Sequence, residues 1–273
     1  MSAETDAALA VDWLALCRRM AEAVRVGLAR YPLYADRALT TGLGVGGDTA
    51  LVIDRVAEEA VFGVLESLDF GLVAVSEERG EVELAGGGPV HVVIDPLDGS
   101  RNAKRGVPLY ALSIAVAGGP TMADVEFAYV HDFSHGEDWW GRRGEGAFLD
   151  GARLPPLDGA QELEMLGLET IRPGLVSESA ARLAATGVAR MRALGSIALS
   201  LCYVAAGRFD GMLTLGESRS VDTAAGQLIV RETGGQVAFP EAGDPLDASL
   251  RLDMRSRVLA AATPPLLELL LSV

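Results

Sequence analysis

The segment HVVIDPLDGS, residues 91–100, most constrains how this chain can fold. Its β-branched start predicts a buried strand, which leads directly into Asp95 and Asp98 with Pro96 between them. Because proline cannot donate a ladder hydrogen bond, we expect the chain to turn there and to leave the Leu97 carbonyl pointing inward. Two carboxylates in one small volume repel each other unless a cation lies between them. The segment therefore favours a cation site at the end of a sheet strand.

Other acids occur at the predicted ends of strands and helices. Glu77 and Glu78 end the apolar run FGLVAVSEE, whereas Asp54 and Asp222 each begin a helical pattern. Acids at element ends are typical of functional sites, because loops carry function on a rigid scaffold. Oxygen ligands without clustered Cys or His favour Mg²⁺, with Mn²⁺ as the alternative, over zinc.

The two residues after Asp98 favour the binding of a phosphate group. Gly99 and Ser100 are predicted to begin a helical turn, whose free backbone N–H groups would face an anion. Glycine also lets a phosphate approach the backbone. Taken alone, Asp-Pro-Leu-Asp-Gly is equally a common turn composition. The longer string DPLDGSRN is too rare for that interpretation to suffice.

Hydrophobic periodicity predicts an α/β fold that divides near residue 145. The predicted helices of the first half are 5–30 and 54–68, and its predicted strands are 70–78, 91–99, 110–119, 123–132 and 136–151. In the second half, short strands near 163–168, 189–193 and 209–213 alternate with helices near 176–185, 196–207 and 222–233. We expect an α+β half with a mostly antiparallel sheet and the metal site over 1–145, and an α/β half over 146–273. The two halves should pack as one compact catalytic unit.

Charge and composition exclude several classes of partner. The net charge of -15 argues against nucleic acid, which is bound through Lys and Arg. The first residues lack the basic start of a signal peptide, and no apolar run approaches the roughly 18 residues of a membrane span. With two cysteines only, a disulfide framework is not expected. These features predict a cytoplasmic protein without a membrane partner.

Three motifs together resemble one enzyme family. IDPLDGSRN, with SEE upstream and VDTAAGQLIVRETGG downstream, is similar to the inositol monophosphatase family, from about Asp48 to Gly235. The resemblance implies a layered αβαβα sandwich of the sugar phosphatase type and a Mg²⁺-dependent phosphomonoesterase that commonly forms a homodimer. The segments DGSRNAKRGVPLYALSIAVA and GSIALSLCYVAAGRFDGML look most similar to the archaeal-type enzymes.

The resemblance also implies a set of metal ligands. Glu77, Asp95 and the Leu97 carbonyl would hold one ion, and Asp95, Asp98 and Asp222 would hold a second. Asp95 would therefore bridge the two ions. Two or three Mg²⁺ ions per site are expected.

The remaining catalytic residues follow from the same resemblance. Glu78 would assist a third ion or its waters, and Asp54 with the Ser100 hydroxyl would position the attacking water. The alternative that Ser100 is itself a nucleophile is less favoured, because no histidine adjoins it in the sequence.

Substrate contacts are predicted at two further positions. Ser196 either faces the substrate hydroxyls, as the resemblance implies, or caps a helix. Arg219, three residues before Asp222, is a candidate contact for a second phosphate or for the ring, although arginines in acidic proteins commonly form ion pairs. The glycine-rich stretch 40–50 formally contains G-x-G-x-x-G, but we expect it to be a mobile flap over the metals.

These observations predict an enzyme that hydrolyses a small polyol or sugar phosphate. Inositol 1-phosphate is the first expected substrate, and fructose 1,6-bisphosphate, alone or as a second substrate, is the alternative. A non-catalytic phosphatase-like binding protein is a third interpretation. It is disfavoured because the expected ligands Glu77, Asp95, Asp98 and Asp222 are all present.

Overall fold

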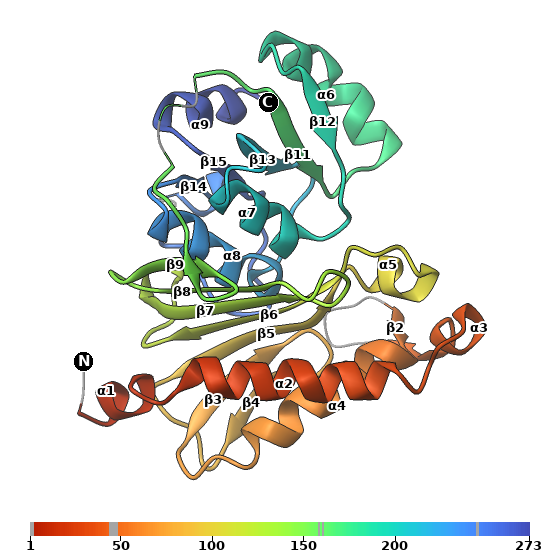
Figure 1. Cartoon of the computed structure of the whole chain (residues 1–273), viewed down its shortest axis with the longest axis vertical. Helices are drawn as coiled ribbons and strands as arrows, with labels where there is room; N and C mark the ends of the chain where they lie inside the picture. Colours follow the sequence, from red (N-terminus) through yellow and green to blue (C-terminus); the bar gives the residue numbers. More distant parts are fainter. Residues whose placement is uncertain (1–2, 44–48, 158, 160, 244–245) are drawn as a thin grey trace.

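A large, mostly antiparallel sheet is built from strands between residues 72 and 153 (Figure 1). The structure is a computed structural model that describes residues 3–43, 49–157, 159, 161–243 and 246–273. Within them, eight strands lie side by side in the order β10 (Ala152–Arg153), β9 (Gly146–Leu149), β8 (Asp138–Arg142), β7 (Val125–Asp132), β6 (Ala111–Ala117), β5 (His91–Asp98), β3 (Leu72–Ser76) and β4 (Gly80–Leu84). β3 and β5 are parallel, and the other neighbours are antiparallel. The prediction of a mostly antiparallel sheet is confirmed.

Two helices from the start of the chain cover one face of this sheet. They are α2 (Trp13–Leu28) and α4 (Val52–Leu65). Trp13, Met20 and Val24 on α2 are fully buried, because their spacing places them on one stripe of the helix. These side chains pack with the inner face of α4 and the sheet as one apolar core.

The single helix predicted over residues 5–30 is wrong at residues 10–12. The chain forms α1 (Ala3–Leu9), leaves the helical conformation after Leu9, and begins α2 directly after its N-cap Asp12. The Asp12 carboxylate accepts a hydrogen bond from the Ala15 backbone N–H at 3.0 Å. An N-cap aspartate satisfies a free amide of the new helix and so favours a break at this point.

A smaller sheet organises the second half of the chain. Its order is β12 (Arg190–Arg192), β11 (Met165–Glu169), β13 (Gly211–Thr214), β15 (Leu259–Ala261) and β14 (Gln236–Ala238). β11 pairs in parallel with β12 and β13, whereas β15 is antiparallel to its neighbours. The three strands predicted in this half are present. β14 and β15, of three residues each, were not predicted.

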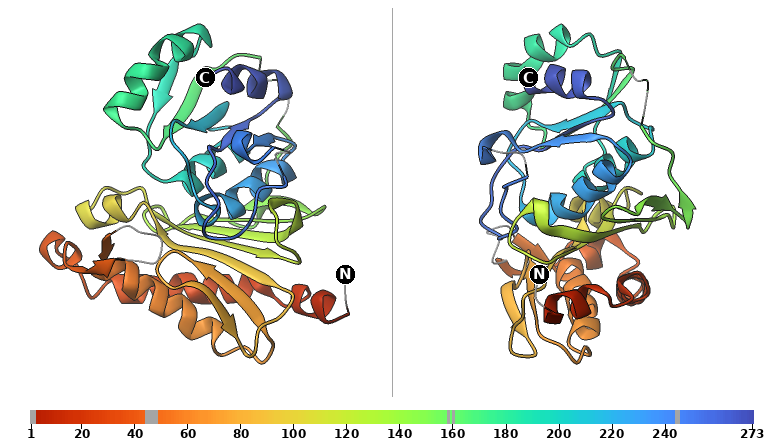
Figure 2. Two further views of the ribbon diagram at one scale, coloured as in Figure 1. Left: turned by 180° about the vertical axis from the view of Figure 1, so that it is seen from behind. Right: turned by 90° about the vertical axis from the view of Figure 1, so that its left-hand side faces the viewer.

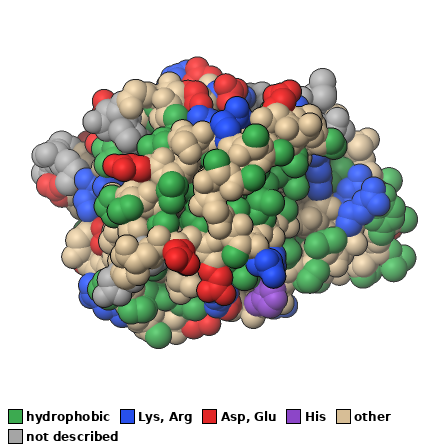
Figure 3. Space-filling view, turned by 90° about the horizontal axis from the view of Figure 1, so that it is seen from above, with side chains coloured by type: hydrophobic (Ala, Val, Ile, Leu, Met, Phe, Trp, Pro, Cys, Tyr) green, Lys and Arg blue, Asp and Glu red, His purple; other side chains and the backbone are tan. Residues whose placement is uncertain are grey.

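Helices lie between the two sheets and outside the smaller one (Figures 1 and 2). α7 (Ile197–Ala205) and α8 (Ser220–Glu232) form the inner layer, and α6 (Pro173–Ala185) and α9 (Pro264–Leu271) form the outer layer. Acidic and basic side chains are interspersed among hydrophobic ones on the face seen from above (Figure 3). The arrangement confirms the predicted αβαβα sandwich.

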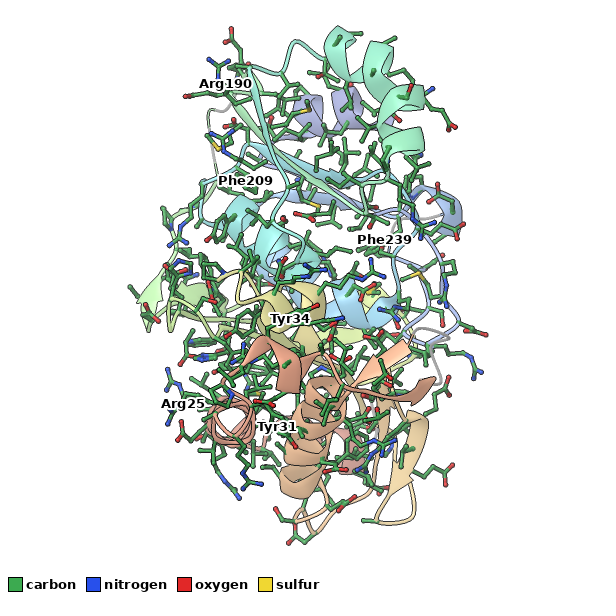
Figure 4. All side chains as sticks on the ribbon, turned by 90° about the vertical axis from the view of Figure 1, so that its right-hand side faces the viewer. Arg25, Tyr31, Tyr34, Arg190, Phe209 and Phe239 are labelled. Atoms are coloured by element: carbon green, nitrogen blue, oxygen red, sulfur yellow. The ribbon has the colours of Figure 1, made fainter. Side chains whose placement is uncertain are left out.

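The inner helices join the two halves through one apolar core. Val93 and Trp139 of the large sheet belong to it together with Leu201 of α7 and Ile229 of α8. Phe239 extends it to the smaller sheet (Figure 4). Because sheets lie on both sides of α8, its residues are buried from 220 to 230.

The described ends of the glycine-rich stretch 40–50 are strands, and the mobile flap stays a prediction. β1 (Thr40–Leu43) and β2 (Thr49–Leu51) pair as an antiparallel hairpin. Residues 44–48 between them, including Asp48, lie outside the described residues. The short helices α3 (Tyr34–Arg37) and α5 (Ser100–Arg105) lie nearby (Figure 1). Of the helices that the structure describes, none has both the length and the apolar character to span a bilayer.

Candidate active site

Three of the predicted metal ligands lie on the same face of the large sheet. β3 and β5 are parallel neighbours in which Val75 pairs with Val93, and both valines face the core beneath α7 and α8. Side chains two residues further along a strand point the same way, so Glu77 and Asp95 lie side by side on that face. Asp222 reaches the same place from the first turn of α8.

A bulge near the end of β5 brings the second aspartate of the motif into the site. Asp95 pairs with Ser113 and Asp98 with Ala111, so three steps along β5 match two along β6. The Asp95 Oδ1 atom accepts a hydrogen bond from the Leu97 backbone N–H at 2.9 Å. The predicted turn at Pro96 is wrong. The strand continues through Asp98 with a local irregularity, because a bulge accommodates proline without ending the strand.

Gly99 is required by the way the chain enters α5. It has φ of 86°, and a Cβ atom there would lie 2.9 Å from the Leu109 carbonyl oxygen and 3.1 Å from the Gly195 carbonyl oxygen. Only glycine meets both the left-handed conformation and this close approach. The predicted helical turn after Asp98 is present as α5.

The Asp98 carboxylate is hydrogen-bonded to the start of α7. Its Oδ2 atom accepts hydrogen bonds from the Ser196 hydroxyl at 2.6 Å and from the Ala198 backbone N–H at 2.7 Å. Ser196 is buried and also caps α7, since its hydroxyl accepts a bond from the Leu199 N–H at 3.3 Å. Helix capping at Ser196 is therefore present, whereas its predicted contact with substrate stays a prediction.

A buried glutamate that the sequence analysis missed holds this turn in place. Glu169, at the end of β11, accepts hydrogen bonds from the backbone N–H groups of Leu194 and Gly195 at 2.8 and 2.9 Å and from the Ser200 hydroxyl at 2.7 Å. Asn102 of the DGSRN motif donates to the Leu194 carbonyl at 2.7 Å. The signal was available, because Glu169 ends the apolar strand MLGLE in the same way that Asp95 ends HVVID.

Asp54 presents one open oxygen beside Ser100. Its Oδ2 atom accepts a bond from the Leu51 N–H at 2.8 Å, whereas its Oδ1 atom is buried and has no hydrogen-bond partner among the described residues. Burial raises the pKa of Asp54 to about 6, although the Leu51 amide and the nearby Ser100 hydroxyl act to lower it. The carboxylate is therefore mostly ionised at neutral pH and can accept a further hydrogen bond.

Arg219 supplies positive charge to the same face. Its Nη1 atom lies 2.6 Å from Glu77 Oε1, and its Nη2 atom lies 3.4 Å from Asp222 Oδ1. Its backbone N–H donates to Asp222 Oδ2 at 2.8 Å. The predicted contact of Arg219 with substrate is not tested, and in this structure its guanidinium is engaged by these acids.

The acids are close enough to perturb one another. Burial, followed by the charges of Glu77, Asp98 and Asp222, raises the pKa of Asp95 well above its usual range. Burial and the Asp222 charge raise the pKa of Asp98 to about 7. Burial and the Glu77 charge likewise raise the pKa of Glu78 to about 7. A cluster with this excess of negative charge favours the binding of cations.

The carboxylate oxygens of the site are suitable ligands for a hard divalent cation, although in this structure they do not surround a single point. Across the part of the chain that the structure describes, no three acidic, histidine or cysteine side chains converge tightly enough to enclose an ion. Two of the carboxylates, those of Glu77 and Asp222, instead accept hydrogen bonds from the Arg219 guanidinium. The available ligands are buried carboxylate oxygens, which suit Mg²⁺ or Mn²⁺.

Comparisons with known proteins show the family of this chain. A model described as the inositol monophosphatase family matches residues 15–273. A protein of Methanothermobacter thermautotrophicus named fructose-1,6-bisphosphatase/inositol-1-monophosphatase is 34% identical over 94% of this chain and 94% of its own length. An inositol-1-monophosphatase of Mesorhizobium japonicum is 36% identical over 73% of this chain and 74% of its own length. The solved structure of an inositol monophosphatase-fructose 1,6 bisphosphatase has a TM-score of 0.83 and 25% identity, covering 96% of this chain and 99% of that one.

Proposed function

This chain belongs to the inositol monophosphatase family and is a phosphomonoesterase, and from that premise we propose that its substrate is the phosphate ester of a small polyol, with inositol 1-phosphate first. The observation that carries the proposal is that buried Asp95 lies within reach of the charges of Glu77, Asp98 and Asp222, with Asp54 and its open oxygen close to Glu77. Clusters of buried acids with raised pKa values are typical of functional sites.

We propose that the cofactor is Mg²⁺, with two or three ions per site and Mn²⁺ as a substitute. Glu77, Asp95 and the Leu97 carbonyl would hold one ion, and Asp95, Asp98 and Asp222 a second. Glu78 would assist a third ion or its waters. When bound, the ions supply the positive charge that lowers the pKa of a water and stabilises charge on the phosphate and the leaving group.

The chain's own residues would orient the reactants. The open Oδ1 atom of Asp54 can accept a hydrogen bond, and then a proton, from the attacking water. The Ser100 hydroxyl beside it can fix the direction of this hydrogen bond. The backbone N–H groups of Gly99 and Ser100 are the proposed phosphate contacts. Because Gly99 has no side chain, a phosphate can come close to this part of the backbone.

Fructose 1,6-bisphosphate is the second candidate substrate. The relative from Methanothermobacter thermautotrophicus, which matches over nearly the whole chain, carries both activities in its name. A second phosphate would need further positive charge near the site. Lys104 on α5 supplies some, because its charge acts on Asp54.

Phosphate release decides between these candidates. We expect the full-length chain to release phosphate from inositol 1-phosphate, from fructose 1,6-bisphosphate or from both in MgCl₂, and to lose activity in EDTA. Undiminished release in EDTA would contradict the metal assignment. Binding of both esters without any turnover would support a phosphatase-like binding protein. The expected homodimer and cytoplasmic location stay predictions, and light scattering of the purified chain would test the former.

A further inference from the structure

We propose that Arg219 is a built-in counter-ion of the metal site, which holds Glu77 and Asp222 in the metal-free chain and must be displaced when a divalent cation binds. The inference rests on the proposed function only in taking those two acids as metal ligands. It adds a competition inside the site that sets how tightly the metal is bound.

The contacts of Arg219 are those of a partner for both acids. One guanidinium nitrogen lies 2.6 Å from Glu77 Oε1 and another lies 3.4 Å from Asp222 Oδ1. The three side chains are mostly buried, with exposed fractions of 17% for Arg219, 20% for Glu77 and 10% for Asp222. Ion pairs at this depth are screened less than surface pairs, so the contacts contribute to the free energy of the site.

The guanidinium bridges two elements that are distant in sequence. Glu77 follows β3, and Asp222 lies in the first turn of α8. Arg219 and Glu77 are 142 positions apart in the sequence. The bridge therefore ties the large sheet to an inner helix at the place where an ion would otherwise do so. A cation ligated by the same carboxylate oxygens cannot share them fully with the guanidinium, because each oxygen has few lone-pair sites.

The backbone of Arg219 is held by hydrogen bonds that do not involve its guanidinium. The Arg219 N–H donates to Asp222 Oδ2 at 2.8 Å, and the Thr223 hydroxyl donates to the Arg219 carbonyl at 3.2 Å. Both bonds survive if only the side chain moves. An arginine side chain has several rotatable bonds, so displacement requires no change in α8.

The test is Mn²⁺ binding to the full-length chain, stripped with EDTA and dialysed, in the absence of substrate. Titration calorimetry and the Mn²⁺ electron paramagnetic resonance signal report binding without any catalytic step. Arg219→Met removes the charge and keeps much of the side-chain length. Arg219→Lys keeps the charge but replaces the planar guanidinium with a compact ammonium that lacks its fixed fork of donors. Arg25→Met is the matched control, because Arg25 pairs with Glu22 on the exposed face of α2 and its loss changes the net charge equally (Figure 4).

We expect Arg219→Met to bind Mn²⁺ at least about tenfold more tightly than the unmodified chain, as the loss of a competing charge-assisted contact would give. Arg219→Lys should lie between the two, and Arg25→Met should not differ from the unmodified chain. In EDTA, Arg219→Met should unfold at a lower temperature, because Glu77 and Asp222 lose their partner.

The opposite outcomes are distinct. A purely structural arginine would give a less stable variant whose Mn²⁺ affinity is unchanged or weaker, and either result overturns the inference while leaving the proposed metal site intact. Equal tightening in Arg25→Met would show a general charge effect and would also overturn it. If neither the unmodified chain nor Arg219→Met binds Mn²⁺, the metal site of the proposed function fails together with this inference.

Discussion

Asp95 is the residue on which the proposed chemistry depends most. It is almost completely buried, and it lies within reach of the charges of Glu77, Asp98 and Asp222. One of its oxygens accepts the Leu97 N–H bond, which shapes the bulge of β5. The residue therefore has a structural bond that asparagine can keep and a charge that asparagine removes.

Asp95→Asn should separate these two roles. We expect kcat/KM in MgCl₂ to fall at least about 10²-fold, because the charge that the transition state uses is lost. The midpoint of thermal unfolding in EDTA should hold or rise, since one of several repelling charges is gone. Phosphate release and calorimetry measure the two effects, with exposed Asp253→Asn as the control. A clear drop of the metal-free midpoint would show instead that the Asp95 carboxylate is needed for the fold.

The raised pKa values of the acids predict how stability depends on pH. The pKa values of Glu78 and Asp98 are each raised to about 7 by burial and neighbouring charges. An unfolded carboxyl titrates near pH 4, so between about pH 4 and 7 the folded chain binds more protons than the unfolded one. Stability in EDTA should therefore fall as pH rises through this window. Saturating Mg²⁺ should reduce the fall, because it stabilises the ionised form.

Thermal unfolding in EDTA at pH 5 and pH 8 tests this sign. We expect the lower midpoint at pH 8, and a smaller difference in Glu78→Gln than in the unmodified chain. A midpoint that rises from pH 5 to pH 8 in EDTA would show that these acids are not buried together.

At the scale of elements, the site depends on where strands and helices begin and end. β3 and β5 end at the same edge because they are parallel, and the first turns of α4 and α8 bring Asp54 and Asp222 to that edge. α5 begins directly after β5, so Gly99 must make the connection in very little space.

Two glycines that flank α5 offer a matched test of this close approach. Gly99 and Gly106 both have left-handed backbones, with φ of 86° and 71°, but a Cβ atom at Gly106 would meet nothing within 4 Å. Gly106→Ala should lower the free energy of unfolding by about 1 kcal/mol, because only its backbone conformation disfavours alanine. Gly99→Ala should cost roughly 1 to 3 kcal/mol more, because backbone carbonyls must move. Urea unfolding measures both, and equal losses would contradict the close approach.

At the scale of the whole molecule, the site lies where the two sheets and the inner helices meet. Asp98 comes from the large sheet, and the turn that holds it is clamped by Glu169 from the smaller sheet. The shared apolar core supports the same connection. The geometry of the site is thus a property of the packed sandwich and not of the first half alone.

Glu169→Gln tests that connection. The amide keeps one oxygen, but its NH₂ group cannot accept a hydrogen bond, so the bond from either the Leu194 or the Gly195 N–H is lost together with the charge. We expect kcat/KM to fall by about 10-fold, because residues that position a metal ligand typically contribute this much. Mn²⁺ affinity should weaken in parallel. The control is exposed Glu162→Gln, whose kcat/KM and Mn²⁺ affinity should equal those of the unmodified chain. The same unchanged values in Glu169→Gln would show that Glu169 does not position Asp98.

The sequence alone determined the elements and the chemistry of the residues at their ends. Strand periodicity placed β5, and acids after apolar runs indicated an oxygen-ligand cation site, because these signals act over a few neighbouring residues. The break between α1 and α2 and the pairing of β1 with β2 were not predicted, since a local cap and a strand pairing overrode the average pattern.

Only the tertiary structure decided which residues face one another. The bonds from Arg219 to Glu77 and from Ser196 to Asp98 join positions 142 and 98 apart, and the clamp at Glu169 was not predicted. Such pairs depend on strand register and on how helices pack between two sheets. Neither is encoded in local spacing, because a one-residue change of register would turn every side chain of a strand to the other face.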